Sequence, residues 1–357
     1  MITILIFIYK HHDTVLIELE SGLTMQARRL IGMIILIAGT ALLLFSIGLS
    51  IISGVSDISL GTVWNSFFHY DASDTSHQII HRVRLPRTVA AILIGAMLAA
   101  SGAIMQGMTR NPLASPQIMG VTSGATFMIA IALVFFPGIS NVNLLLFAFA
   151  GSGLGLGLVF GIGLLARTGL TPVKLALAGT AVTALLGAFS NSLALHFDVA
   201  RDLSFWYAGG VANVQWETVK LLFPAAAIGL ILAFFISGSV TTLSLGEEVA
   251  TGLGLKTGLV KAAGVLVVLI LTGAAVSVGG TIGFIGLVIP HITRFLVGPD
   301  YRWIIPCSAV LGGLLLNFAD IASRMINPPF ETPVGALTAL IGVPFFIYLA
   351  RREGRNI

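Results

Sequence analysis

The sequence predicts an all-α membrane protein whose chain crosses the bilayer about ten times. Of its 357 residues, 56% are hydrophobic and 10% are charged, whereas a soluble domain carries about 25% charged residues. The mean hydropathy is +1.00. About 20 apolar residues are needed to span the hydrocarbon core, so the apolar content suffices for about ten spans and leaves only short connections. These numbers exclude a large soluble domain, and the single cysteine, Cys307, excludes an internal disulfide framework.

Ten apolar runs define the expected spans, and one junction between them is irregular. The runs cover residues 30–52, 88–108, 117–137, 144–166, 173–197, 218–237, 261–279, 281–297, 303–325 and 333–350. Residues 278–281 (Val-Gly-Gly-Thr) join the seventh run to the eighth without a polar loop. We therefore expect a tight turn or a broken helix there, which membrane proteins tolerate only where protein or a cavity shelters the backbone.

The first 24 residues do not follow the pattern of the rest. Residues 1–9 are apolar but too short to span, and Lys10, Asp13 and Glu18 interrupt any continuous helix through the bilayer. Two interpretations remain: residues 1–24 are an extension upstream of the true start, or they form an amphipathic segment at the membrane surface. In either case we expect one transmembrane domain over residues 25–357.

The distribution of basic residues predicts the orientation in the membrane. Lys and Arg concentrate in cytoplasmic loops, and an amino terminus in the cytoplasm places most of the nineteen basic residues on that side. An even number of spans returns the carboxyl terminus to the same side, so we expect both termini to be cytoplasmic. The net charge of +4 is explained by this bias and does not indicate a nucleic-acid partner. Arg82, Arg84 and Arg87 are the exception, since they cluster on the outer side.

The glycine-rich segments indicate helix packing and not a nucleotide site. Glycines 151, 155, 157 and 161 recur at helical spacing inside an apolar run, which allows two helix backbones to approach closely. A phosphate-binding loop needs consecutive Gly-Lys after a strand, and no such motif occurs in the sequence. If the protein moves a solute uphill, the energy must come from a partner or from an ion gradient.

Ionisable residues within the expected spans are few. An ion-coupled transporter needs carboxylates near the middle of the bilayer, and Asp320 is the one candidate. Asp320 and Arg324 are four residues apart on one helix face, and we favour an ion pair between them over an ion site. His291 has no neighbouring ligands in the sequence, so no metal site is expected. We also expect no catalytic residues, because no nucleophile lies beside a base.

Four motifs carry a family resemblance. They are Arg84-Leu-Pro-Arg87 with Arg110-Asn-Pro-Leu-Ala-Ser-Pro116, then Gly246-Glu247-Glu248-Val-Ala-Thr-Gly252-Leu-Gly254, then Gly283-Phe-Ile-Gly-Leu-Val-Ile-Pro290-His291, and finally Asn317-Phe-Ala-Asp320 with Glu331-Thr-Pro333-Val-Gly335. Together they resemble the FecCD/BtuC family of ABC importer permeases, which carry iron–siderophore complexes, haem or vitamin B12. The resemblance covers about residues 30–350, nearly the whole chain.

The resemblance implies a fold, a location and a set of partners. We expect a BtuC-like type II importer fold in the bacterial cytoplasmic membrane, with two permease subunits, either identical or paralogous, around a central pathway. An extracytoplasmic substrate-binding lipoprotein delivers the ligand, and two cytoplasmic ATPase subunits use ATP and Mg; this chain itself binds no cofactor. An iron–siderophore complex is the leading substrate, with haem or cobalamin as alternatives.

The resemblance also implies two sites of contact with partners. On the outer surface, Arg84, Arg87 and Arg324 match the arginines that receive glutamates of the binding protein; anchoring to lipid headgroups is the alternative. On the cytoplasmic side, residues 239–258 match the ATPase-coupling segment, and an ordinary loop is the alternative. The coupling residues are Ser244, Gly246, Glu247, Glu248, Gly252 and Gly254.

The local sequence predicts how the coupling segment folds. Ser244 and Glu247 have capping-box spacing at the start of a short helix, and Gly252 and Gly254 allow that helix to end in a sharp turn.

The substrate pathway is the least determined site. Small polar residues of the fifth run are candidates to line it: Thr180, Thr183, Ser190 and Asn191. Two further hypotheses come from other functional classes, namely an ion-coupled secondary transporter that works alone and a membrane scaffold without transport. The scarcity of carboxylates in the spans, the outer arginines and the coupling segment disfavour the secondary transporter.

Overall fold

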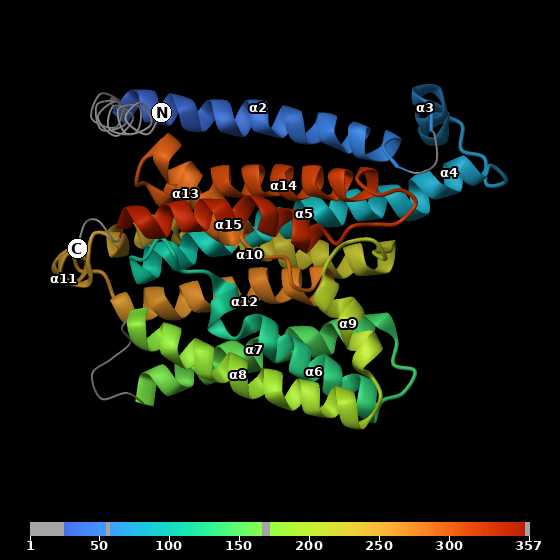
Figure 1. The fold of residues 1–357 in the computed structure, drawn as a ribbon. Coiled ribbons are helices and arrows are strands. Elements are labelled where there is room, and N and C mark those ends of the chain that lie inside the picture. Colours follow the sequence, from blue (N-terminus) through green and yellow to red (C-terminus); the bar gives the residue numbers. More distant parts are fainter. Residues whose placement is uncertain (1–24, 55–57, 166–171, 354–357) are drawn as a thin grey trace, which may run out of the picture.

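The protein folds into a bundle of long, roughly parallel helices (Figure 1). The computed structural model describes residues 25–54, 58–165 and 172–353, and within these ranges every regular element is helical. Residues 1–24, on which the prediction of an amino-terminal extension depends, lie outside the described residues. The elements are α2 (Met25–Ile52), α3 (Leu60–Phe68), α4 (Thr75–Ile79), η1 (Ile80–Arg84), α5 (Leu85–Thr109), η2 (Pro116–Met119), α6 (Val121–Phe135), α7 (Asn141–Leu165), α8 (Pro172–His196), α9 (Ala200–Ala208), α10 (Trp216–Ser244), α11 (Glu247–Gly252), α12 (Thr257–Gly279), α13 (Ile285–Val297), α14 (Tyr301–Met325) and α15 (Val334–Glu353).

The helices confirm the ten expected spans. Seven helices in the described residues are long and apolar enough to cross a membrane, and three shorter apolar helices, α6, α13 and α15, match the third, eighth and tenth runs. The start of α2 and the end of α15 lie at the same end of the bundle, together with α11 (Figure 1). This is the end that the basic residues assign to the cytoplasm. Helices α3, α4 and α9 lie at the opposite, outer end.

Two irregular segments between consecutive spans lie inside the bundle. The expected break between the seventh and eighth runs is confirmed: α12 ends at Gly279 and α13 starts at Ile285, with positive φ at Gly280 and Phe284 (+64° and +68°). A second irregular segment, residues 110–120, separates α5 from α6; a connection was expected between the runs 88–108 and 117–137, but the α-helix of the third run begins later, at Val121. Gln117 in this second segment donates a hydrogen bond from Nε2 to the backbone oxygen of Ile282 in the first. The two segments therefore shelter each other, as irregular backbone inside a membrane requires.

Helix α5 is the centre of the bundle, and glycines bring other helices against its backbone. Nearly all of α5 is buried, and it packs against α10, α12, α13 and α14. A Cβ atom at Gly95 would overlap the backbone oxygen of Gly312 on α14, and one at Gly102 would overlap that of Gly286 on α13. These contacts leave no room for any side chain at either position.

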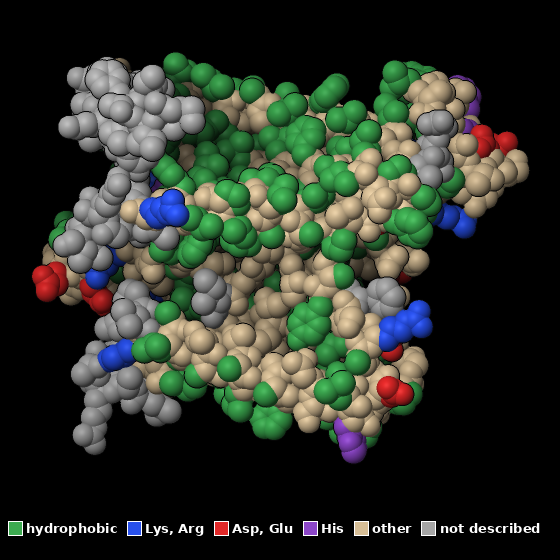
Figure 2. Space-filling model, in the orientation of Figure 1, with side chains coloured by type: hydrophobic (Ala, Val, Ile, Leu, Met, Phe, Trp, Pro, Cys, Tyr) green, Lys and Arg blue, Asp and Glu red, His purple; other side chains and the backbone are tan. Residues whose placement is uncertain are grey.

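The glycine string of α7 also serves packing, but not at every position. Gly151 and Gly155 lie against the backbone of Gly124 and Gly120, at the start of α6, which confirms the packing interpretation for these residues. A Cβ atom at Gly157 or Gly161 would meet nothing within 4 Å, so close packing does not require glycine there. Many large apolar side chains are exposed and are spread over the face of the bundle seen in Figure 2, as expected for a surface in contact with lipid tails.

Candidate docking and coupling sites

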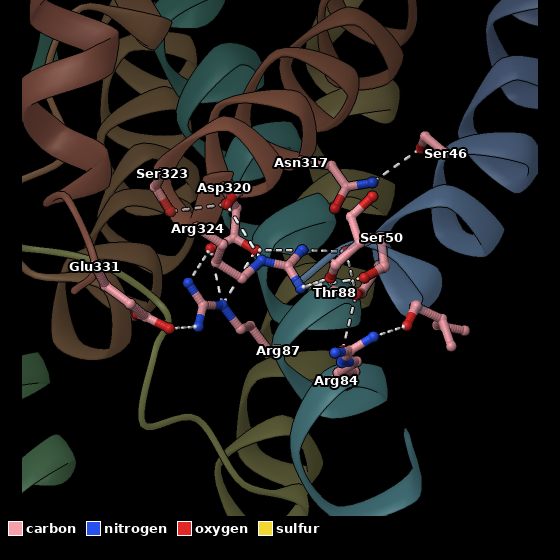
Figure 3. A network of polar contacts seen from close by, with 12 residues as sticks. Ser46, Ser50, Arg84, Arg87, Thr88, Asn317, Asp320, Ser323, Arg324 and Glu331 are labelled. Carbon is pink, nitrogen blue, oxygen red and sulfur yellow. Dashed lines mark hydrogen bonds and ion pairs between the residues drawn. The ribbon is translucent and has the colours of Figure 1, made fainter. Parts of the chain in front are cut away.

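The three outer arginines and two carboxylates form one cluster at the outer end of the bundle (Figure 3). Arg84 ends the π-helical turn η1, Arg87 lies in the first turn of α5, and Arg324 lies in the last turn of α14. Asp320 is one turn before Arg324, and Glu331 lies between α14 and α15. The contact between α5 and α14 at their outer ends thus brings together residues that are more than 230 positions apart in the sequence.

Arg87 holds both carboxylates. Its Nε donates to the two oxygens of Asp320 at 2.9 and 3.1 Å, and its Nη2 donates to Oδ1 of Asp320 at 2.8 Å. Its Nη1 donates to Oε1 of Glu331 at 2.6 Å. Bidentate pairing of this kind is the strong form of an arginine–carboxylate contact because planar guanidinium and planar carboxylate match.

Arg324 and Arg84 are held mainly by backbone oxygens near the end of α2. Arg324 donates from Nη1 to the backbone oxygens of Ser50 and Ser53 at 3.1 and 3.0 Å, and its Nη2 is 3.2 Å from Asp320. Arg84 donates from Nη1 to the backbone oxygens of Ile51 and Ile52. The predicted ion pair between Asp320 and Arg324 is therefore confirmed, and Arg87 shares it. A cation site at Asp320 is disfavoured, because two guanidinium groups already neutralise this carboxylate.

The expectation that the three arginines are exposed on the outer surface is wrong for the subunit by itself. Arg84, Arg87 and Arg324 are 5%, 4% and 6% exposed. The sequence predicted the end of the bundle at which they lie but not their burial, because the carboxylates and backbone oxygens that enclose them come from α2, α14 and the segment before α15. Their role in docking stays a prediction.

A cavity of about 930 Å³ opens beside this cluster. Its wall includes Arg82, Arg87, Trp206 of α9, the loop at residues 208–215, the end of α12, and residues 331–334. Arg82, which the sequence placed in the same outer group, is exposed at this wall. No local pattern in the sequence indicates the cavity, because its wall combines five separate parts of the chain.

The coupling segment folds as a short helix between two long ones, but the predicted capping box is wrong. Ser244 is the last residue of α10, and its hydroxyl donates to the backbone oxygen of Thr241 at 2.7 Å. The residue before α11 is Gly246, whose φ of +127° explains why glycine stands there. Gly252 ends α11 in helical geometry, and Gly254, with φ +82°, makes the turn toward α12 as expected.

Glu247 is anchored to the bundle, whereas Glu248 points to solvent. Nζ of Lys261, on α12, donates to both carboxylate oxygens of Glu247 at 2.8 Å. This hydrogen bond lowers the pKa of Glu247 below its ordinary value. Glu248 is exposed on the same short helix. The arrangement makes α11 a fixed projection at the cytoplasmic end; its contact with an ATPase stays a prediction.

The candidate pathway residues on α8 do not share one environment. Thr180, Thr183 and Asn191 are exposed on the subunit, so their pathway role stays a prediction. Ser190 is fully buried and donates to the backbone oxygen of Leu186 at 2.7 Å, which removes it from the exposed face of α8. Among the described residues, no group of three or more His, Cys, Asp or Glu side chains is arranged to hold a metal ion.

Helix α13, which contains Pro290, relies on a polar contact that the sequence analysis missed. Pro290 has no N–H group to bond the backbone oxygen of Gly286, four residues earlier. Nε2 of Gln106 on α5 lies 3.5 Å from that oxygen and donates to the neighbouring oxygen of Leu287 at 3.1 Å. Arg294 then donates to Oε1 of Gln106 at 3.2 Å and to the hydroxyl of Tyr301 at 2.8 Å. A glutamine within an apolar span was the available signal.

The many apolar spans, and the irregular segments that shelter each other inside the bundle, define a multi-pass membrane protein. Comparison with family models gives the particular family: residues 42–352 match the FecCD transport family. The chain belongs to this family of ABC importer permease subunits, as the motifs indicated, and is a multi-pass protein of the bacterial inner membrane.

Individual relatives agree with this assignment. The chain is 66% identical over 324 residues to the iron(3+)-hydroxamate import system permease protein FhuB of Bacillus subtilis (strain 168), covering 91% of this chain and 84% of the relative. It is 35% identical over 351 residues to the hemin transport system permease protein HmuU of Yersinia pestis, covering 92% and 97%. A solved metal-chelate type ABC transporter in an inward-facing conformation has the same fold, with a TM-score of 0.78 and 31% identity over 89% of this chain and 99% of that one.

Proposed function

We propose that this chain is the transmembrane subunit of a binding-protein-dependent ABC importer that carries iron(III) bound by a hydroxamate siderophore. The observation that carries the proposal is the 66% identity, over 91% of the chain, to a permease named for iron(3+)-hydroxamate import. The relative named for hemin transport is 35% identical, which makes haem the weaker substrate hypothesis. Cobalamin is disfavoured on the same basis, since the relative named for its import is 37% identical.

The proposed complex contains two permease subunits, two ATPase subunits and one binding lipoprotein. Permeases of this family work with other subunits, and the two ends of the bundle offer a surface for each kind. The outer cluster of Arg84, Arg87 and Arg324 supplies an excess of positive charge for acidic groups of the binding protein. Helix α11 projects at the other end, where an ATPase that uses ATP and Mg would bind.

An ion-coupled transporter is the competing function, and Asp320 is the residue on which it depends. In the structure, Asp320 is fully buried and paired with Arg87 and Arg324. A carboxylate that binds a transported proton or sodium ion must exist in a free form during the cycle. Two buried arginines stabilise this free, charged form and oppose the ion-loaded form, because neutralising the carboxylate would leave an excess of buried positive charge.

Uptake into proteoliposomes tests the proposal. The permease, the ATPase and the binding protein are reconstituted together, and uptake of radioactive iron in a trihydroxamate chelate is compared with uptake of haemin and cobalamin. We expect ATP-dependent uptake of the iron chelate that also requires the binding protein. Uptake of haemin or cobalamin alone would refute the substrate assignment. Uptake that needs an ion gradient and no ATP would refute the importer.

A further inference from the structure

Glu331 differs from Asp320, the other carboxylate of the cluster, in its access to solvent. The side chain of Asp320 is fully buried, whereas that of Glu331 is 42% exposed. Asp320 receives three hydrogen bonds from Nε and Nη2 of Arg87, and Glu331 receives one from Nη1. Figure 3 shows Glu331 approaching the guanidinium group from the side opposite α2. Glu331 is thus the carboxylate that another group can replace.

The segment that carries Glu331 is an exposed apolar surface. Residues 325–331 are all exposed, and Met325, Ile326 and Phe330 are 60%, 59% and 71% exposed. Adjacent apolar side chains at the outer end of a membrane protein, beside a buried charge, are typical of a surface that contacts another protein. One backbone bond, from the N–H of Thr332 to the oxygen of Ser323 at 3.1 Å, ties the segment back to α14.

We propose that Glu331 occupies, on Arg87, the position that a carboxylate of the docking binding protein takes. On docking, the partner's carboxylate replaces that of Glu331 on Arg87. Residues 325–333 then lose the contact by which Glu331 holds them to Arg87. This inference rests on the proposed function, because it assumes an acidic protein partner at the outer end.

The charges of the cluster favour such an exchange. Three arginines and two carboxylates leave one positive charge in excess, so an added carboxylate is attracted before Glu331 departs. Glu331 can leave Arg87 at low cost, because water replaces the single hydrogen bond that this half-exposed carboxylate receives. Arg87 keeps its bidentate contact with Asp320 throughout, so at no stage is a buried guanidinium left without a partner.

The exchange also reaches the cavity and helix α15. Residues 331–334 form part of the wall of the 930 Å³ cavity, and α15 begins at Val334. Release of Glu331 therefore moves the cavity wall and the start of a membrane helix together. Docking of the binding protein would in this way alter the permease itself, in addition to delivering the ligand.

Binding measurements on the full transporter in nanodiscs test the exchange. The affinity of the binding protein is measured for the wild type, for Glu331→Gln and for Glu217→Gln, a matched loss of charge at an exposed residue near the outer start of α10. Without its internal competitor, the Glu331→Gln transporter should bind up to about fivefold more tightly, which is the upper end of the range expected of one partly exposed charge pair. Glu217→Gln should bind like the wild type.

A label on the released segment provides a second readout. Cys307 is buried, so a spin label attached to Phe330→Cys reports this position alone. Its mobility should rise when the binding protein is added to the wild type, and should already be high in the Glu331→Gln background. If Glu331→Gln does not fold, Glu331→Asp replaces it; this variant keeps the charge but withdraws the carboxylate from Arg87, and should bind more tightly than the wild type.

The outcomes separate the inference from the function on which it rests. If the wild type does not bind the binding protein, the proposed function fails. If the wild type binds it but Glu331→Gln binds equally or more weakly, the exchange is refuted and the function stands. A label that keeps the same mobility on docking refutes the release of the segment, whatever the affinities.

Discussion

Replacing Asp320 by asparagine should destabilise the subunit more than any other single loss of charge in the described residues. Asp320 is fully buried and lies between Arg87 and Arg324. Asparagine has nearly the same shape, so the substitution removes the charge without creating a cavity. It also replaces an acceptor oxygen with an NH₂ group that faces the guanidinium donors.

The magnitude follows from the contacts of the cluster. Loss of one partner of a buried ion pair costs about 3–5 kcal/mol, because it leaves a charge uncompensated. Here Arg87 retains Glu331, while Arg324 retains only neutral partners: hydroxyl and backbone oxygens. We therefore expect a loss of about 3 kcal/mol, near the lower end of this range. Asp202→Asn, at an exposed residue of α9, is the matched control and should change stability by less than about 0.5 kcal/mol.

Reversible unfolding in mixed micelles measures the effect, with SDS as the denaturant. The double variant Asp320→Asn/Arg324→Gln completes a thermodynamic cycle. It restores the original excess of one positive charge and should be more stable than the sum of the two single changes predicts, by about 1 kcal/mol or more. A loss below about 1 kcal/mol for Asp320→Asn, or two strictly additive changes, would show that this cluster does not stabilise the fold as an ion pair.

Three further predictions concern the coupling segment and the helix contacts. Gly254→Val should reduce assembly with the ATPase in a pull-down assay, because positive φ costs a β-branched residue about 1–2 kcal/mol. Gly252→Val is the control and should assemble normally, because Gly252 has helical geometry and nothing lies near its Cβ position. Gly102→Ala should prevent folding, because its Cβ would overlap the backbone of Gly286, and a detergent-resistance assay measures this. Gly157→Ala, on an open helix surface, should be neutral or stabilising by up to about 1 kcal/mol. The lowered pKa of Glu247 means that its ion pair stabilises fully above the unfolded pKa of about 4.3 and is lost as pH falls through the folded value. SDS titrations should therefore show a smaller difference in unfolding free energy between wild type and Glu247→Gln below about pH 4.3 than at neutral pH. Because the pair is exposed, this change should be under about 0.5 kcal/mol.

The sequence predicted the spans well because membrane insertion imposes a direct requirement on each segment. A run of apolar residues must span the bilayer whatever its neighbours are, and the ten runs correspond to ten helices. The break at residues 280–284 was also predictable, since glycines stand where a polar loop is missing. At residues 110–120 the sequence predicted a connection between spans but not that it extends into the third run, where the α-helix begins only at Val121.

The outer cluster shows where sequence reasoning ends. The spacing of Asp320 and Arg324 revealed one pair on a single helix. The stronger pairing of Asp320 with Arg87 joins α14 to α5 and depends on how the helices pack, which no local pattern encodes. The capping box at Ser244 failed for a related reason. Helix α10 runs on to Ser244, so this serine ends one helix and does not begin the next.

The glycine contacts of α5 join α5, α13 and α14 into a part of the subunit that cannot deform internally. At Gly95 and Gly102, backbone rests on backbone, so there are no rotamers to change and no gap to close. Any relative motion there must carry α5, α13 and α14 as a single rigid body. One end of α5 holds Arg87, and at the other end the guanidinium of Arg110 lies close to Gly246 before α11. A tilt of α5 at its outer end would therefore also displace its cytoplasmic end, beside the coupling segment.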